Sequence, residues 1–415
     1  MRVVQINMVH FGSTGKIMFQ IAKTATKKGV DMRTFSTYLV SKRIIKLPKA
    51  SDGHAYYGSP LGNLMHWLLA RMTGKACFYS RFSTARLIHR IKKFDPHVIH
   101  LHNLHTGYLN LPMLFRYAKK ANAHVIWTLH DCWAFTGKCP HFTMVGCDKW
   151  KNGCHNCPQW KPYTIGPDIS AALWSRKKET FTSLQKLTLV TPSQWLADLT
   201  RQSFLKNYPV HVINNGIDLS VFMPTPSNLR LEWKCENKFV LLGVSFGWGK
   251  RKGLDVFLEL AKQLDDGYRI VLVGTDEMIE KQLPPNIIAV RRTANQMELA
   301  QIYTAADLFV NPTREENYPT VNMESLACGT PVITFQTGGS PEIIDDTCGC
   351  AVGCDDLPEL KAQIERIRRE RPYTRKACLK RAASFNMHHR FEEYVRLYHA
   401  CARDEIVWNE NGKDK

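Results

Sequence analysis

The stretch that decides the fold is DLFVNPTREENYPTVNMESLACGTPVITFQ, residues 307–336. It opens with a short apolar run, DLFVNPT, and closes with a similar run, TPVITFQ. Between them, Pro319 marks a helix start and Cys328-Gly329 marks the helix end, because proline suits the first helical turn and glycine suits the last. Parallel strands need a crossover of this kind, usually a helix. The stretch therefore predicts a strand–helix–strand unit of a parallel sheet.

The same alternation continues in both directions along the chain. Further strands in the second half are predicted at 238–246, 268–276 and 286–293, with helices at 253–264 and 297–306. Strands in the first half are predicted at 1–7, 97–103, 123–131, 187–194 and 211–218, with helices at 12–29 and 111–121. Such alternation predicts the α/β class, with two doubly wound, Rossmann-like domains that face a ligand cleft.

The length of 415 residues also favours more than one domain. An Asn-Gly turn and two prolines at 212–228 mark a hinge. We expect an N-terminal Rossmann-like domain at 1–208 with a Cys-rich insertion at 139–157. A C-terminal domain is expected at 209–383, followed by a helix at 384–407 that packs back on the N-terminal domain.

Charge is distributed unevenly along the chain. The net charge is +19, yet residues 1–215 hold 30 basic and 8 acidic residues, whereas the rest holds 26 and 29. The first half therefore suits a polyanion, which could be nucleic acid, an anionic membrane or a phosphorylated substrate. The ordinary composition excludes a disordered or collagen-like chain, and no apolar run approaches the ~18 residues of a membrane span. The start of the chain is interpreted as the first strand of a cytoplasmic protein, because Gln5 and Asn7 interrupt it.

Two glutamates flank the predicted helix start. Glu316 and Glu324 have seven residues between them. A helix N-terminus offers unpaired N–H groups and partial positive charge, which suit a phosphate. Glu324, about two turns away, can accept hydrogen bonds from sugar hydroxyls. Two solvated glutamates near a helix start would show the same spacing, so the pair alone leaves a phosphorylated-sugar site and a plain surface pair both open.

In the first half, His130 and Asp131 stand at the carboxyl end of a predicted strand, where open α/β sheets place functional residues. The turn at 12–16, GSTGK, follows the first strand but lacks the spacing of a Walker loop. Three histidines on the preceding strand are expected to pack in the core: His100, His102 and His105.

The stretch 307–344 resembles the glutamate–seven–glutamate motif of retaining nucleotide-sugar glycosyltransferases of the GT-B fold, in glycosyltransferase family four (group 1). The resemblance continues in the family's order at VTPSQWLADL, VINNGIDLSVFMP, RKGLDVFLELA, MELAQIYTAADLFVNPT and TGGSPEII. It runs from the glycine turn to about residue 345. The chain also resembles bacterial exopolysaccharide and colanic-acid-type glycosyltransferases, through a similar Cys-rich insertion after the His-Asp strand.

The resemblance implies that 1–208 is the acceptor-side domain and 209–383 the nucleotide-sugar donor domain, and it implies roles for individual residues. Glu316 would contact hydroxyls of the donor sugar, Glu324 the ribose of the nucleotide, and His130 the donor sugar. The residues that resemble the family's cradle for the distal phosphate are Asn317, Tyr318 and Pro319. Because the family transfers by a front-face route, in which the leaving phosphate helps to deprotonate the acceptor, neither glutamate is expected to act as a nucleophile.

Lys252 would supply a charge for the departing diphosphate, and with His130 and Glu316 it completes the predicted catalytic set. The family usually has an arginine five residues earlier, but Gly247 stands there. Arg251 and Lys250 are the candidates to replace it, with Arg251 preferred for donor binding. Gly15 in the first turn resembles the glycine whose backbone approaches the donor phosphates.

Four cysteines fall within nineteen residues: Cys139, Cys147, Cys154 and Cys157. The last two form a C-x-x-C-P knuckle, a spacing that suits tetrahedral zinc–thiolate ligation. His141 and His155 are alternative ligands, an iron–sulfur cluster is a second metal reading, and a metal-free loop is a third. We expect a structural zinc site here and no catalytic metal.

The function expected from these features is retaining transfer of a sugar from a nucleotide-diphosphate donor, UDP- or GDP-linked, to a hydroxyl of a lipid-linked polysaccharide or lipopolysaccharide precursor. Basic and apolar residues alternate over 63–94, which predicts contact with anionic lipid at the inner face of the plasma membrane, although a solvated helix pair is a close alternative. The alternative function is nucleic-acid binding through the basic half and the cysteine knuckle, but it leaves the glutamate motif unexplained. No nucleic-acid partner is therefore expected. A pyridoxal-phosphate phosphorylase would need a lysine pocket that the sequence does not show.

Overall fold

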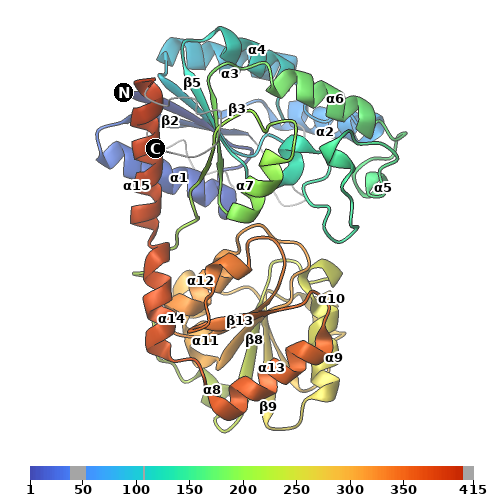
Figure 1. Cartoon of the computed structure of the whole chain (residues 1–415), viewed down its shortest axis with the longest axis vertical. Coiled ribbons are helices and arrows are strands. Elements are labelled where there is room, and N and C mark those ends of the chain that lie inside the picture. The colour runs from blue at the N-terminus through green and yellow to red at the C-terminus, as the bar shows by residue number, and fades with distance from the viewer. Residues whose placement is uncertain (38–52, 106–107, 405–415) are drawn as a thin grey trace. The chain divides into compact units, whose positions relative to one another are not determined.

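The computed structural model describes residues 1–37, 53–105 and 108–404, drawn in Figure 1. Within these ranges the chain forms two compact units. Unit 1 comprises Met1–Ile213 together with the chain from Phe391 onward, and unit 2 comprises Asn214–Arg390. Unit 1 is therefore built from two segments that are separated by the whole of unit 2.

Unit 1 contains a parallel sheet of seven strands in the order β3-β2-β1-β4-β5-β6-β7. The strands are β1 (Arg2–Ile6), β2 (Asp31–Thr37), β3 (His54–Tyr57), β4 (Val98–Leu101), β5 (His124–Thr128), β6 (Leu187–Thr191) and β7 (Val210–Val212). The helices are α1 (Gly12–Lys27), α2 (Pro60–Thr73), α3 (Arg81–Phe94), α4 (Leu111–Lys120), α5 (Trp160–Tyr163), α6 (Ser170–Phe181) and α7 (Gln194–Arg201). Helices α3, α4 and α6 cover one face of this sheet, and α1 covers the other (Figure 1).

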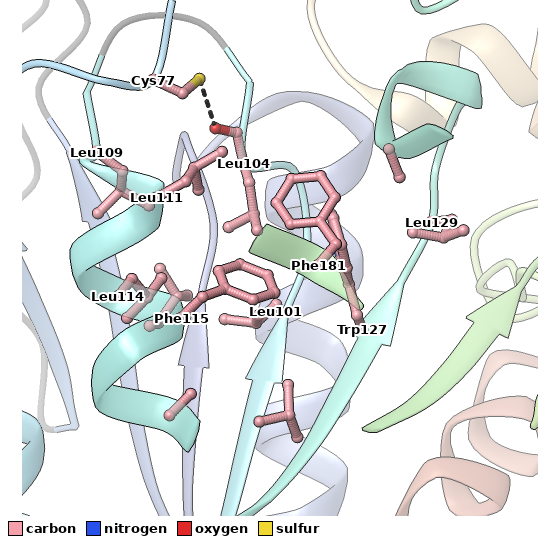
Figure 2. Close-up of a cluster of buried hydrophobic side chains, with 14 of the residues drawn as sticks. Cys77, Leu101, Leu104, Leu109, Leu111, Leu114, Phe115, Trp127, Leu129 and Phe181 are labelled. Atoms are coloured by element: carbon pink, nitrogen blue, oxygen red, sulfur yellow. Dashed lines mark hydrogen bonds between the residues drawn. The ribbon is translucent and has the colours of Figure 1, made fainter. Parts of the chain in front are cut away.

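An aromatic cluster supports the ends of β4 and β5. Figure 2 shows Phe115 of α4 and Trp127 of β5 gathered around Phe181 of α6, with ring centroids 4.8 Å apart in each pair. Leu104 and Leu129, which follow these strands, belong to the same cluster, and the Leu104 carbonyl accepts a 3.2 Å hydrogen bond from the Cys77 thiol. Each large buried side chain contributes about 1.5–3 kcal/mol of hydrophobic free energy. The residues just beyond β4 and β5 are therefore held on a packed base.

Unit 2 contains a parallel sheet of six strands in the order β10-β9-β8-β11-β12-β13. The strands are β8 (Phe239–Val244), β9 (Tyr268–Val273), β10 (Ile287–Val290), β11 (Leu308–Asn311), β12 (Val332–Phe335) and β13 (Gly349–Val352). The helices are α8 (Leu229–Glu232), α9 (Leu254–Gln263), α10 (Glu277–Glu280), α11 (Gln296–Ala305), α12 (Thr320–Ala327), α13 (Leu357–Glu370) and α14 (Arg375–Ala382). Short 3-10 turns that matter below are η1 (Cys132–Phe135) and η3 (Lys250–Lys252).

The last helix is α15 (Met387–Ala402). Its Tyr398 hydroxyl lies 2.6 Å from His100 Nδ1 of β4 and accepts a 3.0 Å hydrogen bond from Gln5 of β1. Of the helix predicted at 384–407, residues 405–407 lie outside the described part of the chain. No helix among the described residues is both long enough and apolar enough to cross a membrane.

The α/β class and the two parallel sheets confirm the predicted fold. β2, β3 and β13 were not predicted. In β2, Thr34 and Ser36 are buried but polar, and both contact the ring of His54 on β3, at 2.8 and 3.2 Å. Polar pairs of this kind remove the apolar pattern by which a strand is recognised in a sequence.

Candidate functional site

In unit 1, the residues that follow β4 and β5 meet in two pairs. His102 Nδ1 lies 3.1 Å from His130 Nε2, with the two rings stacked at a centroid distance of 5.4 Å. His105 Nε2 lies 2.9 Å from Asp131 Oδ2. The other carboxylate oxygen of Asp131 accepts the N–H of Trp133 at 2.9 Å and so caps η1. His102, His105, His130 and Asp131 together line a small pocket.

The protonation states in this pocket follow from burial and charge. Burial opposes ionisation of Asp131, but the charge of His105 and its hydrogen bond prevail and lower the pKa of Asp131 to about 2. Burial is also the main cause that lowers the pKa of His130 to about 4, with the Asp131 carboxylate acting in the opposite direction. At neutral pH, Asp131 is therefore a carboxylate and His130 a neutral imidazole.

His102 is buried, as predicted, and its ring also contacts His130, whereas His105 is only half-buried and contacts Asp131. His100 does lie in the core, where its Nε2 is 2.8 Å from the Thr128 hydroxyl. The sequence signal for the pairing was the position of these histidines just beyond a strand that neighbours the His-Asp strand.

The glycine turn lies at the start of α1 and is tied to the loop after β4. The side-chain amide of Asn7 makes both contacts: its Nδ2 donates a 3.3 Å hydrogen bond to the Thr14 hydroxyl, and its Oδ1 accepts the N–H of Asn103 at 3.2 Å. A Cβ at Gly15 would stand 2.5 Å from the carbonyl carbon of His10, so only glycine fits. The contact of Gly15 with a donor phosphate stays a prediction.

In unit 2, an ion pair joins two of the predicted site residues. Lys252 Nζ lies 2.6 Å from Glu316 Oε2, and both side chains are about four-fifths buried. Lys252 ends η3, and Gly253 follows it with a φ of +74°. A Cβ at Gly253 would stand 2.4 Å from the Pro312 carbonyl oxygen, so the Lys-Gly turn packs directly on the strand exit that carries Glu316.

Arg314 fastens the two loops together and was not predicted. It is 8% exposed and forms ion pairs with Asp255 of α9 at 2.8 Å and with Asp355 at 2.6 Å, and it also bonds the Lys250 carbonyl. Arg251 lies in the same junction, with Nη1 3.4 Å from the Glu315 carbonyl oxygen. Lys250 itself is exposed. The residues around Arg314 in the sequence do not indicate these partners, because the partners lie about 60 residues before it and about 40 after it.

The chain then turns into α12. The Glu316 carboxylate accepts the N–H of Asn317 at 3.3 Å, and the Asn317 carbonyl accepts the N–H of Gly339 at 2.7 Å. Pro319 stands at the N-cap of α12 without a side-chain cap, so the N-terminal turn matches the predicted helix start. Tyr318 packs in the core of unit 2, which leaves its backbone as the part that can face a ligand.

Glu324 lies in the last turns of α12 and is half-buried. One carboxylate oxygen accepts a 3.2 Å hydrogen bond from the hydroxyl of Tyr303, a fully buried side chain of α11. Burial and the nearby Glu324 charge raise the pKa of Tyr303, so this hydroxyl remains a donor. The bond fixes the direction of the Glu324 carboxylate. Lys252, Glu316 and Asn317 are thus brought together in unit 2, whereas Gly15 and His130 belong to unit 1.

The four cysteines of the insertion surround a second cavity in unit 1. Cys139 is buried, the other three are half-buried, and none is disulfide-bonded. Burial, followed by the charges of Cys157 and Cys154, raises the pKa of the Cys139 thiol to about 12. Within the described residues, no three His, Cys, Asp or Glu side chains are placed closely enough to hold a metal ion as they stand.

Comparison with known proteins gives a match in each unit. The model described as Glycosyltransferase Family 4 matches residues 67–221, and the model described as Glycosyl transferases group 1 matches residues 236–370. The protein named for colanic acid biosynthesis, the glycosyl transferase WcaC of Escherichia coli K12, is 26% identical over 276 residues, which are 64% of this chain and 66% of that protein. D-inositol 3-phosphate glycosyltransferase of Mycobacterium sp. (strain JLS) is 26% identical over 43% of this chain and 44% of its own. The chain thus spans two thirds or less of these curated relatives.

Solved structures match nearly the whole chain at low identity. Sucrose-phosphate synthase of Thermosynechococcus elongatus superposes with a TM-score of 0.71 at 16% identity, covering 97% of this chain and 99% of its own. Anabaena HepE, solved in complex with UDP, superposes with a TM-score of 0.68 at 15% identity, covering 96% and 100%. These matches show the GT-B fold. The chain thus carries a domain of glycosyltransferase family 4 at residues 67–221 and a domain of the group 1 glycosyl transferases at residues 236–370.

Proposed function

We propose that the protein transfers a sugar from a nucleotide-diphosphate donor, UDP- or GDP-linked, to a hydroxyl of a lipid-linked precursor of a surface polysaccharide or lipopolysaccharide, with retention of anomeric configuration. We place this reaction at the cytoplasmic face of the plasma membrane. The names of two relatives support the substrate class: HepE was solved with UDP, and WcaC is named for colanic acid biosynthesis.

The observation that carries the proposal is the Lys252–Glu316 ion pair at the entrance to α12. In the transfer, the bond between the anomeric carbon and the diphosphate oxygen breaks, and its electron pair leaves with the diphosphate. The acceptor oxygen bonds the same face of the sugar, and its proton passes to the departing phosphate. Lys252 and the N-terminal turn of α12 offer preorganised positive charge for that leaving group. Glu316, held by Lys252, is positioned to accept hydrogen bonds from donor-sugar hydroxyls.

His130 suits a hydrogen-bonding role toward the sugar. With a pKa of about 4 it is neutral at physiological pH, so it adds no positive charge beside the developing cationic sugar. Its ring is oriented by His102 at 3.1 Å, and the adjacent Asp131 is fixed by His105. We therefore assign His130 to binding the donor sugar, with His102 as a positioning residue.

The donor site is tested by isothermal calorimetry on the full chain with a panel of UDP- and GDP-sugars. Glu324→Ala removes the carboxylate proposed to bind the ribose, and hydrogen bonds to a charged group contribute about 1.5–3 kcal/mol. We expect donor affinity to fall about 10- to 150-fold. The anomeric configuration of the product, determined by nuclear magnetic resonance, tests retention in the same preparation.

Glu365→Ala is the matched control, because Glu365 is a glutamate on the surface of α13, paired only across one helical turn with Lys361. It should leave donor affinity at the parent value. Parent-like donor binding by Glu324→Ala would contradict the ribose assignment, and an inverted product would contradict the retaining mechanism.

Membrane contact is proposed for the α2–α3 segment, residues 60–94, because α2 turns its apolar side chains outward. Its buried residues include two polar ones, Asn63 and His66, which bond the Thr37 hydroxyl at 2.6 Å and the Ser80 hydroxyl at 2.6 Å. The large apolar side chains that it exposes are Leu61, Met65, Trp67, Leu68, Leu69 and Met72. A helix of a soluble surface has the opposite arrangement, and an exposed apolar stripe marks a docking face.

The charge of the segment supports an anionic lipid surface as the proposed occupant of this face. Residues 53–94 contain no acidic residue, and the basic ones all lie exposed: Arg71, Lys75, Arg81, Arg86, Arg90, Lys92 and Lys93. Two of the guanidinium groups lie over exposed aromatic rings. That of Arg71 is 5.7 Å from the centroid of the Trp67 ring, and that of Arg86 is 5.0 Å from the centroid of the Phe82 ring. Each basic residue near an anionic leaflet contributes about 1 kcal/mol, and the apolar stripe adds its own burial.

Leu68→Ser with Met72→Ser should weaken binding of the full chain to phosphatidylglycerol vesicles more than tenfold, because two exposed apolar side chains lose about 2–4 kcal/mol of burial. Neutralising Arg86, Arg90, Lys92 and Lys93 should have a similar effect, and parent binding should fall as salt rises. Vesicle flotation measures both.

Met278→Ser, a change at an equally exposed methionine of unit 2, should leave vesicle binding unchanged. Both α2–α3 variants should keep full turnover on a soluble acceptor. The membrane proposal is wrong if the parent ignores anionic vesicles at low salt, or if Met278→Ser weakens binding as much as the α2 change.

A further inference from the structure

The cysteine insertion is a built loop whose thiols share one cavity. Cys139, Cys147, Cys154 and Cys157 all contribute to the lining, together with the rings of Phe142 and Trp150. Two apolar rings and four thiols give a lining with few oxygen donors, which suits a thiophilic metal and not Ca²⁺ or Mg²⁺. All four cysteines are free thiols, so each sulfur is available as a ligand.

Hydrogen bonds hold the C-x-x-C knuckle from three sides. The Gly137 N–H donates to Cys154 Sγ at 3.2 Å, and the Cys157 N–H donates to Asp168 Oδ2 at 2.6 Å. Lys149 Nζ donates to the carbonyls of His155 and Asn156, at 3.3 and 3.1 Å. Partners beyond the ligands orient metal sites in this way, and an N–H donated to sulfur favours the thiolate that binds metal.

Close packing fixes the knuckle against the rest of unit 1. A Cβ at Gly137 would stand 2.8 Å from the Ser170 carbonyl oxygen and 3.1 Å from the Cys154 Cβ. Glycine at this position therefore allows the first arm of the loop, which carries Cys139, to lie directly against the second. The close approach at Gly137 therefore brings the two arms of the loop together, and the four cysteines line one cavity.

A buried lysine lies beside the cysteines, and burial lowers its pKa to about 7, with the nearby thiols and Asp131 acting in the opposite direction. Lys177 of α6 is 2% exposed, and its Nζ bonds the carbonyl oxygens of Trp133 and Thr136, the latter at 2.8 Å. It lies close enough for its charge to act on the thiols of Cys139 and Cys154. Buried charges in proteins are normally compensated. Four thiolates around one divalent ion carry net negative charge, which the Lys177 ammonium would offset.

We propose that Cys139, Cys147, Cys154 and Cys157 bind one structural zinc ion as thiolates, with release of the thiol protons. Zinc is the metal that four sulfur ligands hold in a closed tetrahedral site without redox chemistry. The thiols line the cavity without yet converging to ligand distance, and binding would draw them together around the ion.

The site would stabilise the end of β5. Cys132, next to Asp131, donates its N–H to the Pro140 carbonyl at 3.0 Å, and the Thr136 hydroxyl donates to the Cys139 carbonyl at 2.6 Å. These two hydrogen bonds join the segment between His130 and Cys139 to the start of the cysteine loop. Zinc would act on the sugar-binding pocket by holding this segment, without contact to a substrate.

The test measures metal in the intact chain. Protein purified without chelator from zinc-supplemented medium should contain near-stoichiometric zinc by elemental analysis, and a mercurial reagent should release it in step with thiol modification. Growth with cobalt should give thiolate-to-cobalt charge transfer and the absorption of a tetrahedral site. Cys154→Ser with Cys157→Ser should lose the metal, whereas Cys354→Ser, at an exposed cysteine of unit 2, should retain it.

The parent measurements need no variant, so a misfolded double mutant does not weaken the test. Iron in place of zinc, absence of both metals, or a cobalt spectrum without thiolate charge transfer would each overturn the proposal. Zinc retained by a folded Cys154→Ser/Cys157→Ser protein would overturn it as well. None of these readouts depends on glycosyl transfer.

Discussion

Replacing Lys252 with alanine should lower kcat by about a hundred- to a thousandfold, the range seen when one preorganised donor to a developing negative charge is removed. The ammonium of Lys252 is held by Glu316 at 2.6 Å, so its position is set before the donor binds. Steady-state kinetics with a nucleotide-sugar donor and a soluble acceptor measure the change. Because the charge acts most strongly on the departing diphosphate, kcat should fall more than donor affinity.

The control lies two residues away. Lys250 belongs to the same basic turn but is exposed, and its side chain contributes charge without the ion pair to Glu316. Lys250→Ala should change kcat less than about threefold, in line with the small effect of exposed charges. Equal losses in the two variants would show that the whole turn acts through its net charge, and parent-like kcat in Lys252→Ala would refute the leaving-group role.

Replacing Gly338 with alanine should lower the free energy of unfolding by about 2–5 kcal/mol, the sum of left-handed strain and overpacking. Gly338 has a φ of +56°, and a Cβ there would stand 1.8 Å from the Glu316 carbonyl oxygen. The backbone that carries Glu316 must therefore move. Urea unfolding measures the stability, and kcat measured well below the unfolding transition should fall too, because the donor-sugar carboxylate is displaced.

A matched variant at Gly247 separates left-handed backbone strain from overpacking as causes of the lost stability. Its φ is +77°, but a Cβ there would meet no atom within 4 Å. Gly247→Ala should therefore lose only about 1–2 kcal/mol, the strain alone, and keep its kcat. If both glycine variants lose the same stability and both keep kcat, the close approach of Gly338 to Glu316 has no functional weight.

Much of the fold was predictable because most strands are apolar runs closed by turns. The stretch at 307–336 confirms this: its predicted strands correspond to β11 and β12, and its predicted helix to α12, which ends before Cys328. The pattern failed at β2, whose buried polar residues are satisfied by His54, and at β13, a four-residue strand that begins with glycine. These two segments lie in the sheet without showing the apolar pattern of a strand. Their burial is visible in the structure but not in a single sequence.

The candidate site was predictable residue by residue but not as a set of contacts. Glu316 and Glu324 follow from their spacing and from the family resemblance, and the roles assigned to them stay predictions. The contact of Lys252 with Glu316 spans 64 residues, and Arg314 reaches partners on both sides in sequence. Such pairings depend on parallel strands placing their carboxyl ends together, which becomes visible only once the strand order β8-β11-β12 is known.

The two-part construction of unit 1 bears on how the chain is synthesised. Gln5 of β1 and Tyr398 of α15 are translated before and after the whole of unit 2, yet their side chains are hydrogen-bonded. Domains generally fold as units, the N-terminal one first, as the chain is made. Here unit 1 remains incomplete until unit 2 has been translated. Until then, the part of its sheet that contacts Tyr398 is not covered by α15. The contact between β1 and α15 can therefore form only after unit 2 has been translated.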